Sequence, residues 1–272
     1  MDYLSKLFID EAKPALKRHS GGSGGSGGDD ITDLAYFFRD GHRLDLLTDG
    51  IDTSKTTNFS YMFDGCNALA AVPELDTSNG TTFAYMFNNC KSLTSVPKLD
   101  TSKGTLFSYM LRGCRSLTSV PELDTSLGNE FLYMFEDCTN LVTIPKLDMR
   151  NSKGATGVLN RCGAITNLKL YNINFPTTIG SGTSYGHLLT LDSLLHTIRE
   201  LIDTGRAYTL TMGNANLEKL ANVYVRTIDI TDEMRAEDEF IDKKLPFEVC
   251  ESTDEGATLI TDYVLMKNWQ LK

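Results

Sequence analysis

The sequence lacks the features that most often reveal catalysis, metal binding or membrane insertion. It has only four histidines and one tryptophan, and no two cysteines lie three positions apart. His187 and His196 are isolated, with no nucleophile near them in the chain, and no glycine-rich phosphate loop precedes a helical segment. No run of 18 apolar residues could form a membrane span. We therefore expect a protein that is not an enzyme, with no metal and no cofactor.

Positive charge is also scarce. Lysine and arginine number 26 against 36 aspartates and glutamates, which gives a formal net charge of −10. Nucleic-acid binding needs clustered positive charge, so we do not expect a nucleic-acid partner. The acidic stretch 232–242 lacks the ligand spacing of an EF-hand, and we interpret it as a solvated face and not a calcium site.

What the sequence does contain is self-similarity with a fixed period of 24 residues. The cysteines mark the register, and a fifth repeat around Cys162 has lost the Phe, the Tyr and the Pro. Residues 29–52 echo the same pattern, and we interpret them as an N-terminal capping repeat. Four segments align without a gap: TSKTTNFSYMFDGCNALAAVPELD from Thr53, TSNGTTFAYMFNNCKSLTSVPKLD from Thr77, TSKGTLFSYMLRGCRSLTSVPELD from Thr101 and TSLGNEFLYMFEDCTNLVTIPKLD from Thr125.

Each repeat can be assigned local structure from its pattern. In the second repeat the apolar residues from Phe83 to Cys90 lie at i, i+3, i+4 and i+7, which predicts a short helix. A polar turn and the segment Leu93 to Leu99 follow, and this segment predicts a strand that Pro97 keeps short. Asp-Thr-Ser then supplies turn residues for the return. Because parallel strands lie about 4.8 Å apart and helices about 8–10 Å apart, the stacked repeats should curve.

The repeat cysteines lie on the inward stripe of the predicted helix, where a free thiol packs as a small apolar side chain. We interpret them as a reduced packing ladder, with metal or disulfide chemistry as the alternative. Cys250 has no evident partner in the sequence.

The motif Phe-x-Tyr-Met-Phe-x-x-Cys-x-x-Leu-x-x-Val-Pro-x-Leu-Asp-Thr-Ser resembles the BspA-type leucine-rich repeat family over residues 29–220. This family occurs in bacterial surface proteins and in proteins of phages and prophages. The resemblance implies an α/β fold: a curved leucine-rich-repeat-like solenoid over residues 29–175, with a short strand and a short helix in each repeat. A C-terminal α/β capping region would cover residues 176–272.

The segment after the array is similar to the closing module of such proteins in phages and prophages of gut bacteria. Leu194, Leu195, Ile198, Leu201 and Ile202 form a helical stripe, which Asp192 or Thr190 would cap. The resemblance implies a strand over residues 208–212 and a final strand containing Trp269 and Leu271. Residues 221–262 depart from the short ending, and we interpret them as an inserted strand pair or an extended loop.

The front of the chain differs in composition from the rest. Residues 20–28 read SGGSGGSGG, a flexible Gly/Ser linker of the synthetic type. It joins the array to residues 1–19, in which Leu4, Leu7, Phe8 and Leu16 indicate an amphipathic helix that Pro14 would kink. We interpret residues 1–19 as a tethered partner peptide that docks on the array, with a tag or remnant as the alternative.

Two surfaces are candidates for peptide binding. One is the strand surface, which is small and polar and is lined by Thr94, Ser95, Thr118, Ser119 and Thr143. The other is the exposed flank of the capping repeat, where an apolar groove would suit an amphipathic helix. The residues of this flank are Tyr36, Phe37, Phe38 and Leu46.

Two further rows recur every 24 residues. The repeat tyrosines should point away from the inner stripe, and we expect them to stack between repeats and not to serve recognition. The charges after each proline alternate in sign, and we expect them to form a stabilising ladder. The alternative is that a partner protein recognises this row of charges. The two rows are Tyr61, Tyr85, Tyr109 and Tyr133, and Glu74, Lys98, Glu122 and Lys146.

These observations favour a non-catalytic protein–protein interaction scaffold. The resemblance implies a structural component of a phage particle that binds a short segment of a partner protein. It would lie in the virion or in the cytoplasm of the infected bacterium. The alternatives are a surface adhesin or receptor-binding module, and an intracellular phage protein that modulates a host enzyme.

Overall fold

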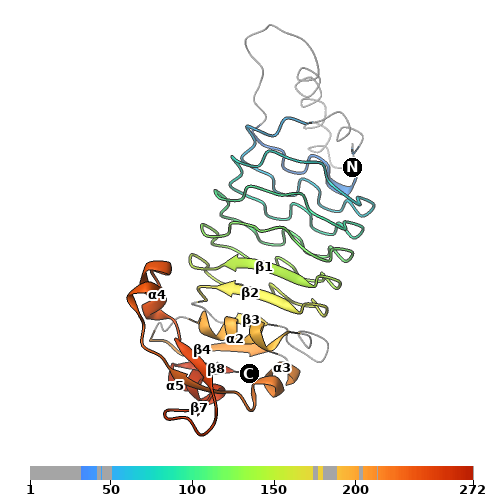
Figure 1. The fold of residues 1–272 in the computed structure, drawn as a ribbon. Coiled ribbons are helices and arrows are strands. Elements are labelled where there is room, and N and C mark those ends of the chain that lie inside the picture. Colours follow the sequence, from blue (N-terminus) through green and yellow to red (C-terminus); the bar gives the residue numbers. More distant parts are fainter. Residues whose placement is uncertain are drawn as a thin grey trace.

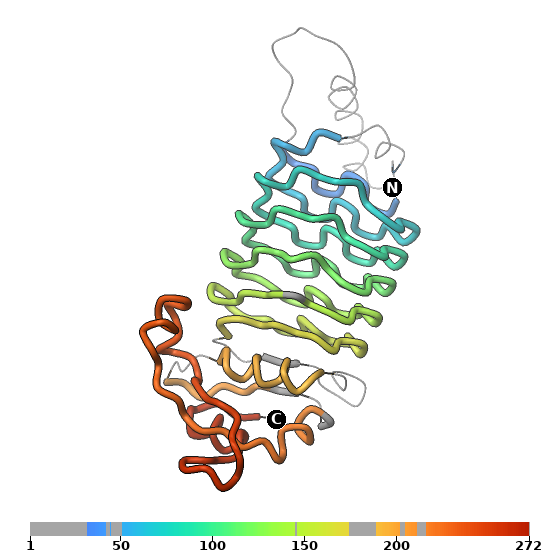
Figure 2. The backbone as a smooth tube through the Cα atoms, in the orientation of Figure 1, coloured from blue at the N-terminus to red at the C-terminus, as the bar shows by residue number. Residues whose placement is uncertain are grey.

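The computed structural model describes residues 32–41, 44, 51–173, 177–179, 189–201, 205–212 and 214–271. Successive repeats lie one on another from the N-terminal end (Figures 1 and 2), and the labelled α-helices lie at the C-terminal end (Figure 1). The 24-residue register is visible in an unbroken series of parallel bridges, which joins Asp33, Asn58, Thr82, Leu106 and Glu130.

The predicted helix in each repeat is wrong. Within residues 51–173 the structure has no α-helix, and the segment Phe83 to Cys90 is a series of turns. Alternate backbone N–H groups donate to carbonyls of the following repeat: Phe83 to Leu106 (2.9 Å), Tyr85 to Ser108 (3.0 Å), Phe87 to Met110 (2.8 Å) and Asn89 to Arg112 (2.7 Å). The backbone therefore joins neighbouring repeats where an α-helix would bond to itself.

The turns explain why the apolar spacing resembled a helix. The intervening N–H groups of Met86, Asn88 and Cys90 bond three residues back, and the chain reverses at Tyr85 and Asn89, whose φ angles are 59° and 58°. A reversal every four residues returns side chains at i, i+3, i+4 and i+7 to one face. Asn tolerates this left-handed conformation, whereas a Tyr there costs about 1–2 kcal/mol. Capping and array repeats share the feature at Tyr36, Tyr61, Tyr85, Tyr109 and Tyr133.

The strand side of the array is narrow. In the first repeats single hydrogen bonds join neighbouring segments, such as Thr94 N–H to the Ala70 carbonyl at 3.1 Å. Regular strands form only at β1, Thr143–Asp148, and β2, Asn167–Tyr171, which pair in parallel. Their register shifts between Ile144 and Leu147, next to Pro145, which has no N–H to donate.

The core runs the length of the array. Phe, Met, Cys and Leu side chains of each repeat are buried, and the Phe rings of neighbouring repeats stack, as in Phe83 and Phe107 with centroids 5.8 Å apart. The first Phe ring of a repeat lies against a glycine: a Cβ on Gly104 would lie 2.5 Å from the Phe107 ring and 3.1 Å from the Phe83 ring. Gly80 and Gly128 are equally close to their rings.

Where a Phe is missing, the glycine is also replaced. In the fifth repeat Ala155 takes the place of the Phe, and Ser152 takes the place of the glycine. At the other end the capping repeat has Leu34, and the repeat stacked on it has a buried Thr56 at the glycine position. The glycines are therefore required by the stacked rings, and not by the backbone angles of the loop.

The C-terminal region closes the stack. Helix α2, Leu191–Arg199, follows an N-cap at Thr190 and buries the expected stripe of Leu194, Leu195 and Ile198, while Ile202 lies outside the described residues. Strand β4, Tyr208–Met212, covers the segment expected to be a strand, and it pairs in parallel with β3, Thr177–Ile179, and with β8, Trp269–Leu271. Helix α3, Asn214–Leu220, follows β4.

The insertion contains a second small sheet. Strand β5, Tyr224–Thr227, pairs antiparallel with β6, Phe247–Cys250. Of the two structures expected for residues 221–262, a strand pair or an extended loop, this is the strand pair. β5 also pairs with β7, Thr258–Leu259, which leads into α5, Ile260–Met266. Between β5 and β6 lie α4, Asp232–Glu237, and the 3-10 helix η3, Ile241–Lys243. Another 3-10 helix of the same length, η1, Arg39–Gly41, belongs to the capping repeat.

A buried ion network anchors the insertion. The side chain of Lys244 is 4% exposed, and its Nζ lies 2.8 Å from Glu200 Oε2 and also contacts Asp238. Burial disfavours the ammonium ion, but the hydrogen bonds with Asp238 and Glu200 outweigh it and raise the pKa of Lys244. Glu200 Oε2 also accepts the backbone N–H of Asn172 at 3.1 Å, so the network connects the insertion to the last repeat.

The Gly–Phe packing predicts that Gly104→Ala lowers the free energy of unfolding by about 1–3 kcal/mol, because overpacking a tight core forces rings from their positions. A urea titration followed by circular dichroism measures this. In a Phe107→Leu background the penalty for Gly104→Ala should shrink. An equal penalty in both backgrounds would show that the ring is not its cause.

The ion network predicts that Lys244→Met destabilises the protein by about 3 kcal/mol, since removing one partner leaves buried carboxylates uncompensated. The neighbouring Lys243→Met is the matched control, because Lys243 is exposed and lies only over the Phe240 ring, 5.8 Å from its centroid. Equal unfolding midpoints for the two variants would contradict the anchoring role of Lys244.

Candidate functional site

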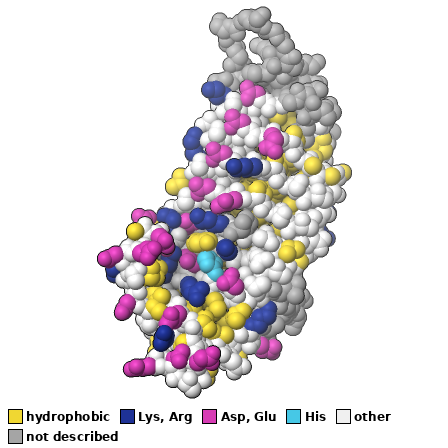
Figure 3. All heavy atoms as spheres, in the orientation of Figure 1, with side chains coloured by type: hydrophobic (Ala, Val, Ile, Leu, Met, Phe, Trp, Pro, Cys, Tyr) yellow, Lys and Arg dark blue, Asp and Glu magenta, His cyan; other side chains and the backbone are white. Residues whose placement is uncertain are grey.

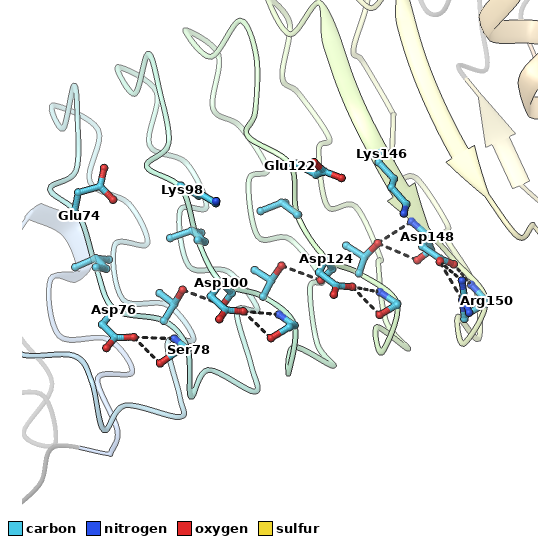
Figure 4. A pocket seen from close by; sticks show the side chains of 18 residues that line it. Glu74, Asp76, Ser78, Lys98, Asp100, Glu122, Asp124, Lys146, Asp148 and Arg150 are labelled. Carbon is cyan, nitrogen blue, oxygen red and sulfur yellow. Dashed lines mark hydrogen bonds and ion pairs between the residues drawn. The ribbon is translucent and has the colours of Figure 1, made fainter. Parts of the chain in front are cut away.

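A groove of about 850 Å³ runs along the array, just after the prolines of successive repeats. Three repeats contribute the same five-residue segment of Glu or Lys, Leu, Asp, Thr and Ser, which begins at Glu74, Lys98 and Glu122. The next repeat adds Lys146, Asp148 and Arg150 at the C-terminal end. Figure 4 shows two rows of side chains along the groove, one of alternating Glu and Lys and one of Asp.

The row of alternating charges is not the ladder of ion pairs that the sequence suggested. The side chains of Glu74, Lys98, Glu122 and Lys146 are all exposed, and among the described residues no salt bridge joins them. Lys146 Nζ lies 5.4 Å from the centroid of the Tyr171 ring. The remaining charges of the row face the groove without an ion-pair partner in this part of the chain.

The second row holds its carboxylates in a fixed position. Asp76 Oδ1 accepts the backbone N–H of Ser78 at 3.0 Å and its hydroxyl at 2.7 Å, and Asp100 accepts the same two bonds from Ser102. These bonds, the serine hydroxyl foremost, lower the pKa of Asp76 and Asp100. The third repeat repeats the arrangement with Asp124 and Ser126. Each carboxylate is thereby oriented before any partner arrives.

A ladder of threonines fixes the spacing of the groove from below. The hydroxyl of Thr77 donates to the Asp100 carbonyl at 2.9 Å, and Thr101 donates to the Asp124 carbonyl at 2.8 Å. Both threonines are buried. Because each bond connects one repeat to the next directly beneath the aspartates, the distance between successive carboxylates is set by the stack.

The insertion contacts the C-terminal end of the groove at Arg150. Arg150 Nη2 lies 2.8 Å from Asp148 Oδ2, and its Nη1 lies 3.2 Å from Glu239 of the insertion. The Phe240 ring stacks under the same guanidinium, 5.2 Å away. Burial would raise the pKa of Asp148, but hydrogen bonds from Arg150 and Asn172 outweigh it and lower that pKa. The cation at this end is therefore already neutralised.

The predicted strand surface is mostly exposed and lies outside the groove. Thr94, Ser95, Thr118 and Ser119 are exposed, and Thr143 is partly buried at the start of β1. The Thr94 hydroxyl bonds to the Ala70 carbonyl at 3.2 Å. These residues precede the prolines, so none of them lines the groove.

The predicted capping flank is only partly available. Tyr36 is 50% exposed and Phe37 is partly buried. Phe38 cannot contact a docked peptide as predicted, because it is fully buried and stacks on Phe63 with centroids 5.2 Å apart. The turn at Tyr36 directs the side chain of Phe38 into the core, while the side chains next to it in the sequence are less buried. Leu46 lies outside the described residues, as do Leu4, Leu7, Phe8 and Leu16 of the predicted peptide.

The repeat tyrosines stack on one another, as expected from their period. Ring centroids of Tyr61 and Tyr85 are 4.4 Å apart, and the series continues from Tyr36 through Tyr109 to Tyr133. Such pairs contribute about 0.5–1.5 kcal/mol each, which is comparable with the cost of their left-handed backbone. The row ends where Tyr133 covers Gly157, on which a Cβ would lie 2.3 Å from that ring. This row is structural.

The repeat cysteines form a ladder of free thiols in the core. The thiol of Cys114 donates to the Phe87 carbonyl at 3.2 Å, and that of Cys138 to the Leu111 carbonyl at 3.0 Å. Burial raises the pKa of Cys114 to about 12 and that of Cys162 to about 12. The five repeat thiols are buried and free of disulfide bonds. Among the described residues no cluster of three or more His, Cys, Asp or Glu side chains could hold a metal ion.

Sequence reasoning missed the aspartates as site residues because it interpreted Asp-Thr-Ser only as turn chemistry. The sequence does show an aspartate two residues after each Glu or Lys of the alternating row. The groove itself, however, depends on how the segments of neighbouring repeats stack.

Comparison with known families finds one match. Residues 32–146 match a family described as "Mycoplasma protein of unknown function, DUF285", which is associated with BspA-like repeat proteins. The match covers the capping repeat, the array and the groove lining as far as Lys146. No curated protein and no solved structure matches the chain. In the described part of the chain, no helix combines the length and the apolar character that crossing a bilayer requires.

The thiol ladder predicts the reactivity of the native protein. A thiol reagent should modify only Cys250, which is half-buried, whereas all six cysteines should react in denaturant. The Cys250→Ser variant should show no rapid reaction when folded. Rapid modification of a second thiol in the native protein would contradict the burial of the ladder.

Proposed function

We propose that this chain is a non-catalytic, protein-binding solenoid of leucine-rich-repeat type, whose groove takes an extended segment of a partner protein. The observation that supports it is the row of exposed charges at Glu74, Lys98 and Glu122, which have no ion-pair partner in the described structure, beside aspartates that are already oriented. Surface charges contribute little to folding. Regularly spaced charges in a groove instead give specificity toward a complementary chain.

The proposal extends to residues 1–19 as a captured partner segment. Nine linker residues reach at most about 30 Å. The groove begins one repeat from the capping repeat, which is about 5 Å along the stack at the spacing of parallel strands. The tethered segment could therefore reach the groove, and its sequence carries Lys13, Lys17 and Arg18. The resemblance to phage and prophage proteins favours a particle component as the setting for this binding.

The direct test separates the two parts. A protein of residues 29–272 is titrated with a synthetic peptide of residues 1–19 and with a scrambled peptide of the same composition. We expect the native peptide alone to bind, and Glu122→Lys to weaken the binding severalfold, because one attraction becomes a repulsion. Glu218→Lys is the matched control, since Glu218 is exposed on α3, away from the groove lining.

The outcomes separate the parts of the proposal. No binding at millimolar peptide would contradict the captured-partner interpretation. Binding that Glu122→Lys and Glu218→Lys change equally would show that residues 1–19 dock elsewhere.

A further inference from the structure

The pattern of charged side chains along the groove recurs every two repeats, and not every repeat. The repeat with Glu74 and Asp76 presents two carboxylates, and so does the repeat with Glu122 and Asp124, two positions further along. The repeat between them presents Lys98 beside Asp100, which offset each other. We call each repeat with two carboxylates an acidic step. Along the groove, two acidic steps are therefore separated by one repeat whose charges offset each other. The groove as a whole is acidic, since its lining has six carboxylates and three cations.

The stack fixes the distance between the acidic steps. Neighbouring rings in the array have centroids from 4.4 Å for Tyr85 and Tyr109 to 5.8 Å for Phe83 and Phe107. These values bracket the spacing of parallel strands, so two repeats advance by about 9.6 Å. A partner that contacts both acidic steps must place two cations at this separation on one side of its chain.

A polyproline II segment meets this requirement. It has three residues per turn and rises about 3.1 Å per residue, so residues i and i+3 lie on one side about 9.3 Å apart. In a β-strand the nearest same-side residues, i and i+2, are only about 6.7 Å apart, and residue i+3 points to the opposite side. An α-helix matches only at i+7, about 10.5 Å, and is about 10 Å wide.

We propose that the groove binds an extended, basic segment of a partner protein in the polyproline II conformation, with Lys or Arg at every third position. This inference rests on the proposed binding of an extended segment, and it specifies a preferred partner other than residues 1–19, in which no two basic residues lie three positions apart. Cations at i and i+3 meet the carboxylate pairs of Glu74 with Asp76 and of Glu122 with Asp124. The residues between them pass Lys98, which repels a further cation, so a continuous polybasic chain is disfavoured.

Designed peptides test the register on the protein of residues 29–272, in which no tethered segment competes for the groove. Proline-rich peptides of identical composition carry two arginines at i and i+2, at i and i+3, or at i and i+4, and their binding is measured by fluorescence anisotropy at low salt. An alanine-rich helical peptide with arginines at i and i+7 is the fourth probe. We expect the i, i+3 peptide to bind about three- to tenfold more tightly than the others, as expected for two exposed ion pairs.

Variants of the groove separate the contributions. The double variant Glu74→Gln/Glu122→Gln should bring the extended peptides to equal affinity, whereas Glu218→Gln should leave the preference unchanged. Lys98→Gln should weaken the discrimination between spacings, because the repulsive step is removed. Circular dichroism of each variant confirms that the array is folded.

The possible failures are distinct. If none of the basic peptides binds at millimolar concentration, the groove is not a peptide site and the proposed function fails with this inference. If all spacings bind equally in the unmodified chain, the groove binds basic chains but the three-residue register is wrong. Preference for the helical i, i+7 peptide would overturn the extended conformation.

Discussion

The structure depends on the backbone hydrogen bonds that join each repeat to the next. Alternate N–H groups, such as those of Tyr85 and Phe87, reach carbonyls of the following repeat, while the groups between them close turns within the repeat. Almost every donor of this segment is thereby used without a helix or a regular strand. The side chains follow from this constraint. Stacked tyrosines offset the strain of a left-handed backbone, and glycines such as Gly104 accommodate rings that must lie one above another.

The same constraint prepares the groove. Because hydrogen bonds of the Thr77 type connect neighbouring repeats directly beneath the aspartates, the carboxylates recur at the spacing of the stack. A flexible loop could not hold charges at a defined separation, and each partner contact would then cost ordering entropy. At the far end the insertion contacts the last cation of the groove, since Glu239 pairs with the guanidinium of Arg150 and the Phe240 ring stacks on it. Figure 3 shows side chains of both charge signs distributed along this face of the molecule.

Much of this organisation can be predicted from the sequence, and the exceptions have physical reasons. The period, the buried residues of the array and the tyrosine row follow from spacing, while the strand over residues 208–212 was expected from the family resemblance. The helix in each repeat does not exist, because a reversal every four residues gives the same apolar spacing as a helix. Phe38 was assigned to a binding flank because the turn that directs it inward is at Tyr36. A tyrosine in the sequence does not indicate a left-handed turn. The groove was missed because it is formed by neighbouring repeats together.

The bonding pattern between repeats can be observed directly by NMR. Scalar couplings across hydrogen bonds, measured on a deuterated and isotope-labelled sample, identify the carbonyl that accepts each amide proton. The inter-repeat arrangement predicts a coupling between the amide nitrogen of Tyr85 and the carbonyl carbon of Ser108, with equivalent couplings one repeat earlier and later along the stack. A coupling from Tyr85 to the carbonyl of Thr81, four residues back, would instead establish a helix and contradict the arrangement from which the groove spacing follows.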